Sequence, residues 1–321
     1  MFSLKPKTLH YWYKHELSGY DQDIASGKWG AQKIATEVDV STGEVVTEIP
    51  VHIASEQNMG AHMTIDEKQI GKKMYTVMTN AQTGKIALLV PTLKGAELAD
   101  AIAFVSEKVP LVQSISCDMS PSYMKFCREN FRSAQLVIDK FHVVKHVMDA
   151  LQQVRIKIKK TIVDKIVPDK SGQNDEAQWT EAEMLERSRY FICKMEADWE
   201  QQERTMAALL FEKYPILKKA YELTQKLRKW YSNKNVGKHP NLVEIELYQW
   251  CDEVLASKIS EFRTVRKMIE KHQDNIINYF KEGRTNAKAE NMNGKIQRFL
   301  ANNFGIKDRD FFLYRLAKYF A

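Results

Sequence analysis

Cysteine is scarce in this sequence, and the four cysteines lie far apart: Cys117, Cys127, Cys193 and Cys251. No two of them form a Cys-x-x-Cys pair, which argues against a zinc ribbon or a secreted disulfide framework. Long apolar runs are missing too, since no stretch reaches the roughly 18 apolar residues of a membrane span. The start, Met-Phe-Ser-Leu-Lys-Pro-Lys, lacks the apolar centre of a signal peptide. We therefore expect a cytoplasmic protein.

What is present is material for a large folded core. The 321 residues are 44% hydrophobic and 28% charged, which excludes collagen-like, low-complexity and wholly disordered classes. This length suits two ordinary domains, or one large domain with an insertion. The formal net charge is +7, a mild excess that points to a polyanion partner only if the charge is clustered.

The first half of the chain carries the β signal. Residues 1–60 are mixed and read as an N-terminal remnant or linker, with a hairpin expected around the turn Ser41-Thr-Gly43. Residues 61–149 predict three hairpin-linked strands, a helix, a fourth strand ending at Asp118, a second helix and a fifth strand ending at Asp139. The order β-β-β-α-β-α-β predicts a mixed α/β sheet. It fits an RNase H-like core with strand order 3-2-1-4-5.

The period becomes helical from about residue 141. Apolar residues from Val143 to Ile162 form one stripe, and Thr180 with Glu183 reads as a capping box that starts another long helix. Nothing in residues 150–285 reads as a strand, so we expect an all-helical insertion there. Residues 286–321 then predict the C-terminal helices of the interrupted core.

Three acidic residues stand where a sheet of this order would bring them together. Asp66 is expected to end the first strand of the core, Asp118 ends the fourth, and Glu290 lies on the helix after the insertion. In the order 3-2-1-4-5 the first and fourth strands are parallel neighbours about 4.8 Å apart. Mg²⁺ prefers oxygen ligands, and two ions about 4 Å apart can promote phosphodiester chemistry. Taken singly, an acid at a strand end is more often a turn former or helix cap.

Three blocks of sequence resemble the catalytic domain of bacterial insertion-sequence transposases of the ISL3 class. They are Ser116-Cys-Asp118-Met-Ser-Pro-Ser-Tyr123, Val137-Ile-Asp139-Lys-Phe-His142-Val-Val-Lys145 and Thr285-Asn-Ala-Lys-Ala-Glu290-Asn-Met-Asn-Gly-Lys-Ile296. The resemblance covers about residues 60–155 and 284–320. It implies a DDE triad on an RNase H-like fold, interrupted by a helical insertion before the glutamate. By this resemblance Asp66, Asp118 and Glu290 are the catalytic and metal-binding acids.

The resemblance also sets expectations about cofactor and partners. We expect two Mg²⁺ ions, with Mn²⁺ able to substitute, and double-stranded DNA as substrate in the bacterial nucleoid. Two transposon ends must be joined, so a homodimer on DNA is expected. Full-length relatives carry a zinc-binding module and a helix-turn-helix in front of the catalytic domain, and this sequence has no such zinc-ligand set. The chain is therefore expected to be truncated, or to work with a separate DNA-binding subunit.

Several other residues are candidates for supporting the acids. Asp139 competes with Asp118 for the role of second acid, but it lies one strand further from Asp66. The resemblance implies an Asp-x-x-His signature, here Asp139 to His142. His142 would hold Asp139 or a substrate phosphate, or would merely satisfy a backbone carbonyl. Asn286, Glu290 and Asn293 share one helical face that would look into the active site.

Basic residues predict the DNA contacts. The stretch from Lys213 to Lys238 holds eight Lys or Arg against the single acid Glu222. Such clustering favours contact with phosphates, while a solvated helix face is the alternative. The predicted DNA-binding residues are Lys213, Lys218, Lys219, Lys226, Arg228, Lys229, Trp230, Lys295 and Arg298. Trp230 would stack on an unpaired base or, as we favour, belong to the core.

The sequence thus leads to one main hypothesis and to two alternatives, one of which, an RNase H-like nuclease with another role, shares the chemistry of the main hypothesis. The main hypothesis is a DNA transposase that hydrolyses a phosphodiester at an insertion-sequence end and transfers the freed strand to target DNA. The other alternative is a non-catalytic DNA-binding remnant or regulator of transposition.

Overall fold

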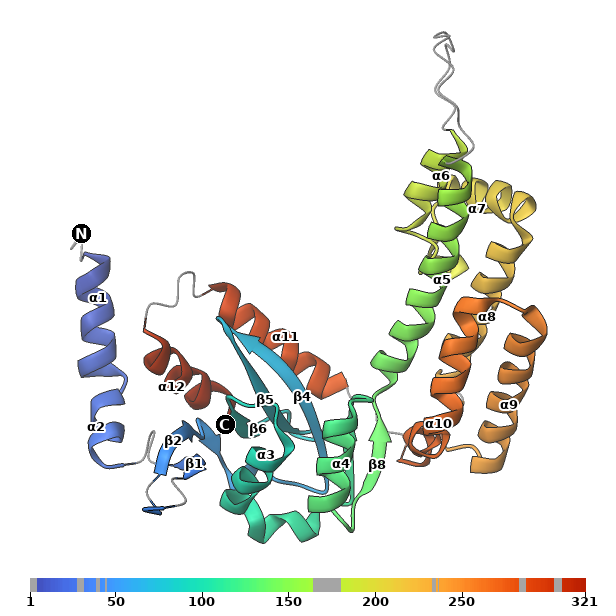
Figure 1. Cartoon of the computed structure of the whole chain (residues 1–321). Helices are drawn as coiled ribbons and strands as arrows, with labels where there is room; N and C mark the ends of the chain where they lie inside the picture. The colour runs from blue at the N-terminus through green and yellow to red at the C-terminus, as the bar shows by residue number, and fades with distance from the viewer. Residues whose placement is uncertain are drawn as a thin grey trace. The chain divides into compact units, whose positions relative to one another are not determined.

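The chain forms two compact units, seen here in a computed structural model. It describes residues 5–27, 32–38, 41–43, 45–163, 180–232, 235, 237–282, 287–302 and 308–321. One unit joins the two ends of the chain, residues 1–137 and 285–321, and the other is residues 138–284. The first contains the sheet and the second the long central helices (Figure 1).

A mixed six-stranded sheet is the centre of the first unit. Its strands are β3 (Ile53–Ala54), β4 (His62–Ile70), β5 (Lys73–Asn80), β6 (Ile86–Val90), β7 (Ser114–Cys117) and β8 (Gln135–Ile138). They lie in the order β3-β6-β5-β4-β7-β8. β4 pairs with β5 in antiparallel and with β7 in parallel. The predicted α/β class with a mixed sheet is confirmed.

The hairpin between β4 and β5 depends on a glycine. Ile70 pairs with Lys73, so only two residues make the turn. The first of them, Gly71, has φ of 63°, a left-handed conformation that glycine adopts without a steric penalty. β4 therefore continues to Ile70, four residues beyond the end that the sequence predicted at Asp66. That prediction of a strand end was wrong, because β4 stays paired with β5 from Asp66 to Ile70.

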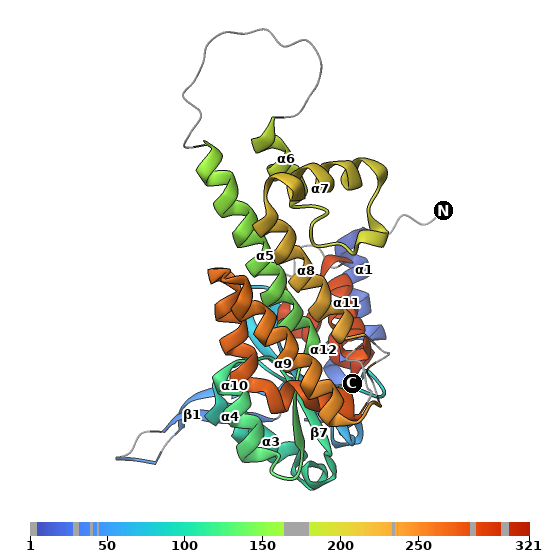
Figure 2. The same cartoon turned by 90° about the vertical axis from the view of Figure 1, so that its right-hand side faces the viewer.

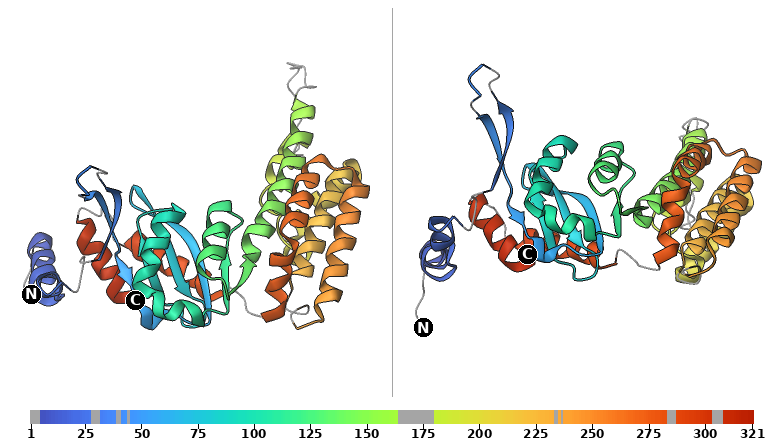
Figure 3. Two further views of the ribbon diagram at one scale, coloured as in Figure 1. Left: turned by 60° about the horizontal axis from the view of Figure 1, so that its bottom comes forward. Right: turned by 90° about the horizontal axis from the view of Figure 1, so that it is seen from below.

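Helices cover both faces of this sheet. One apolar cluster joins β5 residues Tyr75 and Val77 to Ile296 of α11 (Ala287–Asn302) and to Phe312 and Leu316 of α12 (Arg309–Phe320). Successive strand residues point to opposite faces. In keeping with this, the Thr76 hydroxyl lies 2.9 Å from the hydroxyl of Tyr123 on α4 (Pro121–Asn130). α4 packs against α3 (Gly95–Ile102), so α3 and α4 cover the face opposite to α11 and α12 (Figure 3).

Shorter elements complete the first unit. α1 (Pro6–Trp12), the π-helix η1 (Tyr13–Leu17) and α2 (Tyr20–Ala25) precede a two-stranded antiparallel sheet of β1 (Lys33–Val38) and β2 (Val45–Pro50). Tyr20 is buried against Phe311 and Tyr314 of α12. Two 3-10 helices, η2 (Glu56–Asn58) and η3 (Ala103–Leu111), lie between strands.

The second unit is built of helices. Its elements are α5 (Lys140–Val163), α6 (Glu181–Ser188), η4 (Glu196–Asp198), α7 (Gln201–Lys213), α8 (Pro215–Trp230), α9 (Pro240–Ser257) and α10 (Ser260–Glu282). α5 packs against α8 and α10, and α9 packs against the same two helices (Figure 2). α6 begins with the predicted capping box of Thr180 and Glu183. After β8, the described residues of this unit contain no strand.

No helix within the described ranges is both long enough and apolar enough to cross a membrane.

Candidate functional site

The parallel pair β4 and β7 brings two of the predicted acids to one level of the sheet. His62 pairs with Ser114, Met63 with Ile115 and Thr64 with Ser116. Continued for two more residues, this register sets Asp66 opposite Asp118. Both acids are half-buried. The two segments, far apart in the sequence, thus pair side by side up to two residues before each acid.

Backbone donors hold both carboxylates. Asp118 is the first residue after β7, and its Oδ1 accepts a hydrogen bond of 2.9 Å from the Ser120 N–H, in a turn that leads into α4 at Pro121. Oδ1 of Asp66 accepts a bond of 2.8 Å from the Glu67 N–H. Such bonds limit the rotation of a carboxylate. Both acids are therefore oriented by their own local backbone.

The hydroxyl of Tyr123 lies within electrostatic range of both acids. Burial raises the pKa of Tyr123 most, the hydrogen bond with Thr76 lowers it, and the negative charges of Glu67, Asp118 and Asp66 raise it further. Tyr123 belongs to the first block of the family resemblance, but no role was predicted for it. Negative charge from β4 and from the end of β7 therefore acts on this one hydroxyl.

The helix that carries Glu290 lies against the same strand as Asp66. α11 contacts β4, and Figure 1 shows the two elements next to each other. Ile296 of α11 packs on Ile70 and Val77. In β4, Ile70 and Asp66 are four residues apart and so face the same side of the sheet. α11 therefore covers the face of the sheet that bears Asp66.

Three predicted residues near α11 are only partly described. Glu290 and Asn293 lie on α11, but their side chains are outside the described part of the structure, and Asn286 lies outside the described residues altogether. Lys295 and Arg298 are exposed on the same helix. The role of Glu290 as third acid thus remains a prediction, supported by the helix that carries it.

Asp139 and His142 lie at the start of α5, in the helical unit. Oδ1 of Asp139 accepts a hydrogen bond of 2.9 Å from the Phe141 N–H, so Asp139 caps the helix. The half-buried His142 ring makes an edge contact with the Phe141 ring, 5.6 Å between centroids. No hydrogen bond between Asp139 and His142 is present among the described contacts. Capping of α5 is thus the structural role that the described contacts give to Asp139 in the Asp-x-x-His signature.

Comparison with known proteins decides the family. A family model described as a transposase, that of the ISL3 DDE transposases, matches residues 63–316. That range covers well over half of the chain. The chain belongs to the ISL3 family of DDE transposases. No curated protein and no solved structure matches it. Transposases act on DNA and are enzymes of the polynucleotidyl-transferase type.

The transposase already uses part of its basic stretch for internal contacts. Lys213 pairs with Glu181, Lys226 with Glu253 and Lys238 with Glu246. Arg228 donates a hydrogen bond of 2.6 Å to the carbonyl of Cys193. In contrast, three lysines have no ion-pair partner among the residues the structure describes: Lys218, Lys219 and Lys229. Lys218 and Lys229 are exposed and Lys219 is half-buried.

The structure corrects the base-stacking assignment of Trp230. This side chain is only 6% exposed. Its indole N–H donates a bond of 3.0 Å to the carbonyl of Val243, and its ring packs edge-on against Phe280 with centroids 4.5 Å apart. A ring with both faces covered cannot stack on a base. Trp230 belongs to the core of the helical unit, which is the alternative that its apolar surroundings favoured.

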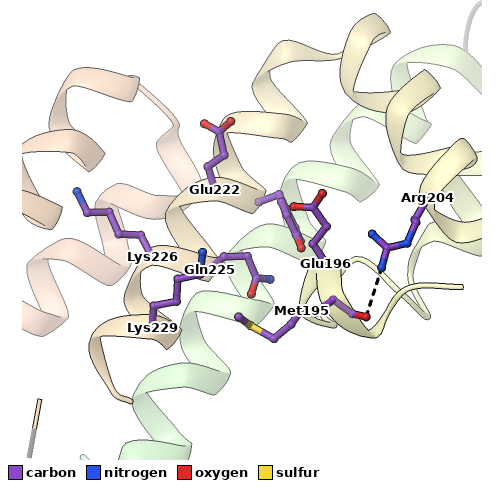
Figure 4. A pocket seen from close by; sticks show the side chains of 9 residues that line it. Met195, Glu196, Arg204, Glu222, Gln225, Lys226 and Lys229 are labelled. Atoms are coloured by element: carbon purple, nitrogen blue, oxygen red, sulfur yellow. Dashed lines mark hydrogen bonds between the residues drawn. The ribbon is translucent and has the colours of Figure 1, made fainter. Parts of the chain in front are cut away.

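A surface cavity of about 660 Å³ lies between α8 and the segment that leads into α7. Lys226 and Lys229 extend from α8, and Arg204 of α7 lies across from them (Figure 4). Two acids, Glu196 and Glu222, line the same cavity. Arg204 was not among the predicted residues, because it lies outside the basic stretch and only the fold brings it near Lys226 and Lys229.

The acids of this transposase suit a divalent cation. Among the side chains that the structure describes, no group of three His, Cys, Asp or Glu is arranged to hold a metal ion. The third predicted ligand, Glu290, is not one of those side chains. Asp66 and Asp118 supply half-buried carboxylates at one level of two adjacent strands. Carboxylate oxygens are the donors that Mg²⁺ and Mn²⁺ prefer, so the two residues fit such an ion.

Proposed function

We propose that this chain is the catalytic part of a transposase that hydrolyses a phosphodiester at the end of an insertion sequence and transfers the strand to target DNA. The observation that supports the proposal is the parallel register of β4 and β7, which pairs Thr64 with Ser116 and, continued for two residues, would set Asp66 opposite Asp118. The family match gives the transposase role, and this register gives a place for the chemistry.

The strand order supports an RNase H-like core. Counted from β4, the five strands β4 to β8 occur in the sheet as 3-2-1-4-5, with the short β3 added at the edge next to β6. In such an order the first and fourth strands are parallel neighbours. The C-terminal helix α11 returns to the first strand after the helical unit, so a third acid from the far end of the chain can join the two aspartates.

In this proposal Asp66, Asp118 and Glu290 hold two divalent cations, Mg²⁺ or Mn²⁺. When bound, such ions lower the pKa of water and stabilise charge on phosphate oxygens. The chain's own part is positional. The Ser120 and Glu67 N–H groups orient the two aspartates, and the unpaired lysines of α8 attract the DNA backbone. Catalysis then comes chiefly from placing the scissile phosphate and balancing its charge.

The wider assembly is proposed on the same basis. Two transposon ends have to be held together, so we infer a homodimer on DNA. We also propose that a separate DNA-binding subunit contributes to the recognition of end sequences.

Cleavage by the purified chain tests the proposal. Supercoiled DNA and short duplexes that contain an insertion-sequence end are incubated with Mg²⁺ or Mn²⁺. Asp118→Asn is assayed beside Glu129→Gln, which changes an exposed acid on the following helix α4. We expect metal-dependent nicking that is lost only in Asp118→Asn. Binding without cutting, also after a DNA-binding subunit is added, would favour the non-catalytic alternative.

A further inference from the structure

A line of polar residues leads along β4 and β7 to the two aspartates. The register pairs His62 with Ser114 and Thr64 with Ser116, and its continuation sets Asp66 opposite Asp118. The first four of these side chains are 5–7% exposed. Three successive residue pairs on one face of the two adjacent strands are thus polar. The first two of these pairs are buried.

The opposite face of the same two strands is apolar. Met63, Ile65, Ile115 and Cys117 alternate with the polar residues, and each is 1–2% exposed. Both sets of side chains are buried, so burial alone does not explain why one face is polar and the other apolar. Buried polar groups cost free energy unless they are hydrogen-bonded, so an apolar face would be the default here. Among the buried residues of β4 and β7, the polar ones are confined to the face that carries Asp66 and, by the continued register, Asp118.

The innermost pair is joined directly. Nδ1 of His62 lies 2.8 Å from Oγ of Ser114, a buried hydrogen bond between the two strands. On the next level the Thr64 hydroxyl donates to the carbonyl of Thr79 on β5, at 3.4 Å. A slip of one residue between β4 and β7 would break the bond between His62 and Ser114. It would also turn one set of side chains to the wrong face.

We propose that His62 and Ser114 are positioning residues for the metal site. Their hydrogen bond holds β4 and β7 in the register that sets Asp66 opposite Asp118, two levels further along the strands. The inference rests on the proposed function, because it assumes that the two aspartates bind the cation together. Neither residue touches DNA or metal in this scheme. Both act through the separation of the two carboxylates.

Mn²⁺ affinity tests the inference without any assay of activity. The full chain is titrated with Mn²⁺ in the absence of DNA, and free Mn²⁺ is measured by electron paramagnetic resonance. Ser114→Ala and His62→Leu remove the bond, while His62→Asn keeps a short amide that can bond to Ser114. We expect Kd for Mn²⁺ to rise about tenfold in the first two variants, as when hydrogen-bond partners of metal ligands are lost. His62→Asn should restore most of the affinity.

The matched control is Asn58→Ala. Asn58 is 6% exposed, and its side-chain amide donates a bond of 2.9 Å to the carbonyl of Ile86 on β6, two strands away from β4 in the sheet. All variants are titrated well below their melting temperatures, checked by circular dichroism. The inference is wrong if Ser114→Ala and His62→Leu lower Tm as Asn58→Ala does but leave Kd unchanged. If Asp118→Asn also leaves Kd unchanged, the proposed metal site itself fails, which is a separate result.

Discussion

Asp118 follows β7 at the position that the parallel register sets opposite Asp66 on β4. Two features determine the positions of these acids, namely the register of the two strands and the turn that follows β7. β7 ends at Cys117, and Asp118 then accepts a hydrogen bond from the Ser120 N–H, while β4 continues past Asp66 into its hairpin with β5. The two strands are paired as far as Thr64 and Ser116, and each acid follows two residues later on its own segment.

The first prediction separates the two neighbouring acids of β4. Asp66 and Glu67 point to opposite faces of the sheet, because successive strand residues alternate. Only Asp66 shares the face that α11 covers. We expect Asp66→Asn to lower the rate of metal-dependent DNA cleavage by roughly a hundred- to thousandfold, as for loss of one group that stabilises a transition state. The rate is measured on a duplex with an insertion-sequence end.

Glu67→Gln is the matched control for that variant. It removes one negative charge from the adjacent, exposed position, so the change in net charge is identical. We expect it to cleave DNA at close to the wild-type rate. Equal losses in both variants would mean that the reaction depends on the total charge of this region and not on the face of β4.

The second prediction concerns which lysines of α8 contact DNA. Lys229 has no ion-pair partner among the described residues, whereas Lys226 pairs with Glu253. A lysine without an ion-pair partner can neutralise a DNA phosphate and release its counterion. Each phosphate neutralised in this way makes the slope of log K against log salt steeper by about 0.9. We expect Lys229→Ala to weaken duplex binding and to reduce that slope by about one unit. Fluorescence anisotropy at several salt concentrations measures both effects.

Lys226→Ala is the internal comparison, because it removes the same charge one helical turn away. We expect it to change the slope by less, since Lys226 already neutralises Glu253. Equal slopes for the two alanine variants would show that the ion pair opens on DNA. An unchanged slope in Lys229→Ala would place the DNA contacts elsewhere.

The strands of the sheet and the long helices were predictable because their signals are local. Alternating strands, the hairpin turns and the helical period from residue 141 follow from short stretches of sequence, and the family blocks mark Asp118 and Glu290. The end of β4 was not predictable in the same way. Asp66 resembles a strand terminator, but Gly71 allows the true turn four residues later, and hydrogen bonding with β5 keeps the intervening residues in the strand.

The sequence did not predict which residues of different helices contact each other. The basic stretch from Lys213 to Lys238 reads as one charged face, yet Glu181, Glu246 and Glu253 neutralise part of it from other helices. Trp230 shows the same limit, since Val243 and Phe280 cover it from α9 and α10. Charge and aromatic content can be counted in a sequence, but their exposure depends on how the helices pack.

The third prediction tests the contact of α11 with the sheet. Ile296 is fully buried in the cluster that includes Tyr75, Val77 and Phe312. Truncation to alanine leaves a cavity, and we expect Ile296→Ala to lower the free energy of unfolding by about 2–5 kcal/mol. Urea denaturation measures the change. Lys295→Ala, at the exposed neighbouring position, should stay within about 0.5 kcal/mol of wild type. Equal stability of both variants would contradict the packing of α11 on β4 and β5.

The fourth prediction is a dependence of stability on pH that arises at His52. Burial lowers the pKa of His52 most, and the charges of Arg309 and Lys73 lower it further, to about 4 from the ordinary 6.5. Below pH 6.5 the unfolded chain binds a proton at this histidine that the folded chain does not bind. Folding is therefore favoured above pH 6.5, and stability falls as the pH drops from 6.5 towards 4. The loss amounts to at most about 3 kcal/mol from this group.

His52→Gln should remove that part of the pH dependence, because glutamine does not titrate. Urea unfolding at pH 7.5 and at pH 4.5 gives two free energies for each protein, and their difference is compared between variant and wild type. We expect a smaller difference in His52→Gln. His146→Gln, an exposed position on α5, is the control and should keep the wild-type difference. A wild-type pH difference that survives in His52→Gln would mean that the folded protein accommodates a protonated His52, against the burial and the two cations that surround it.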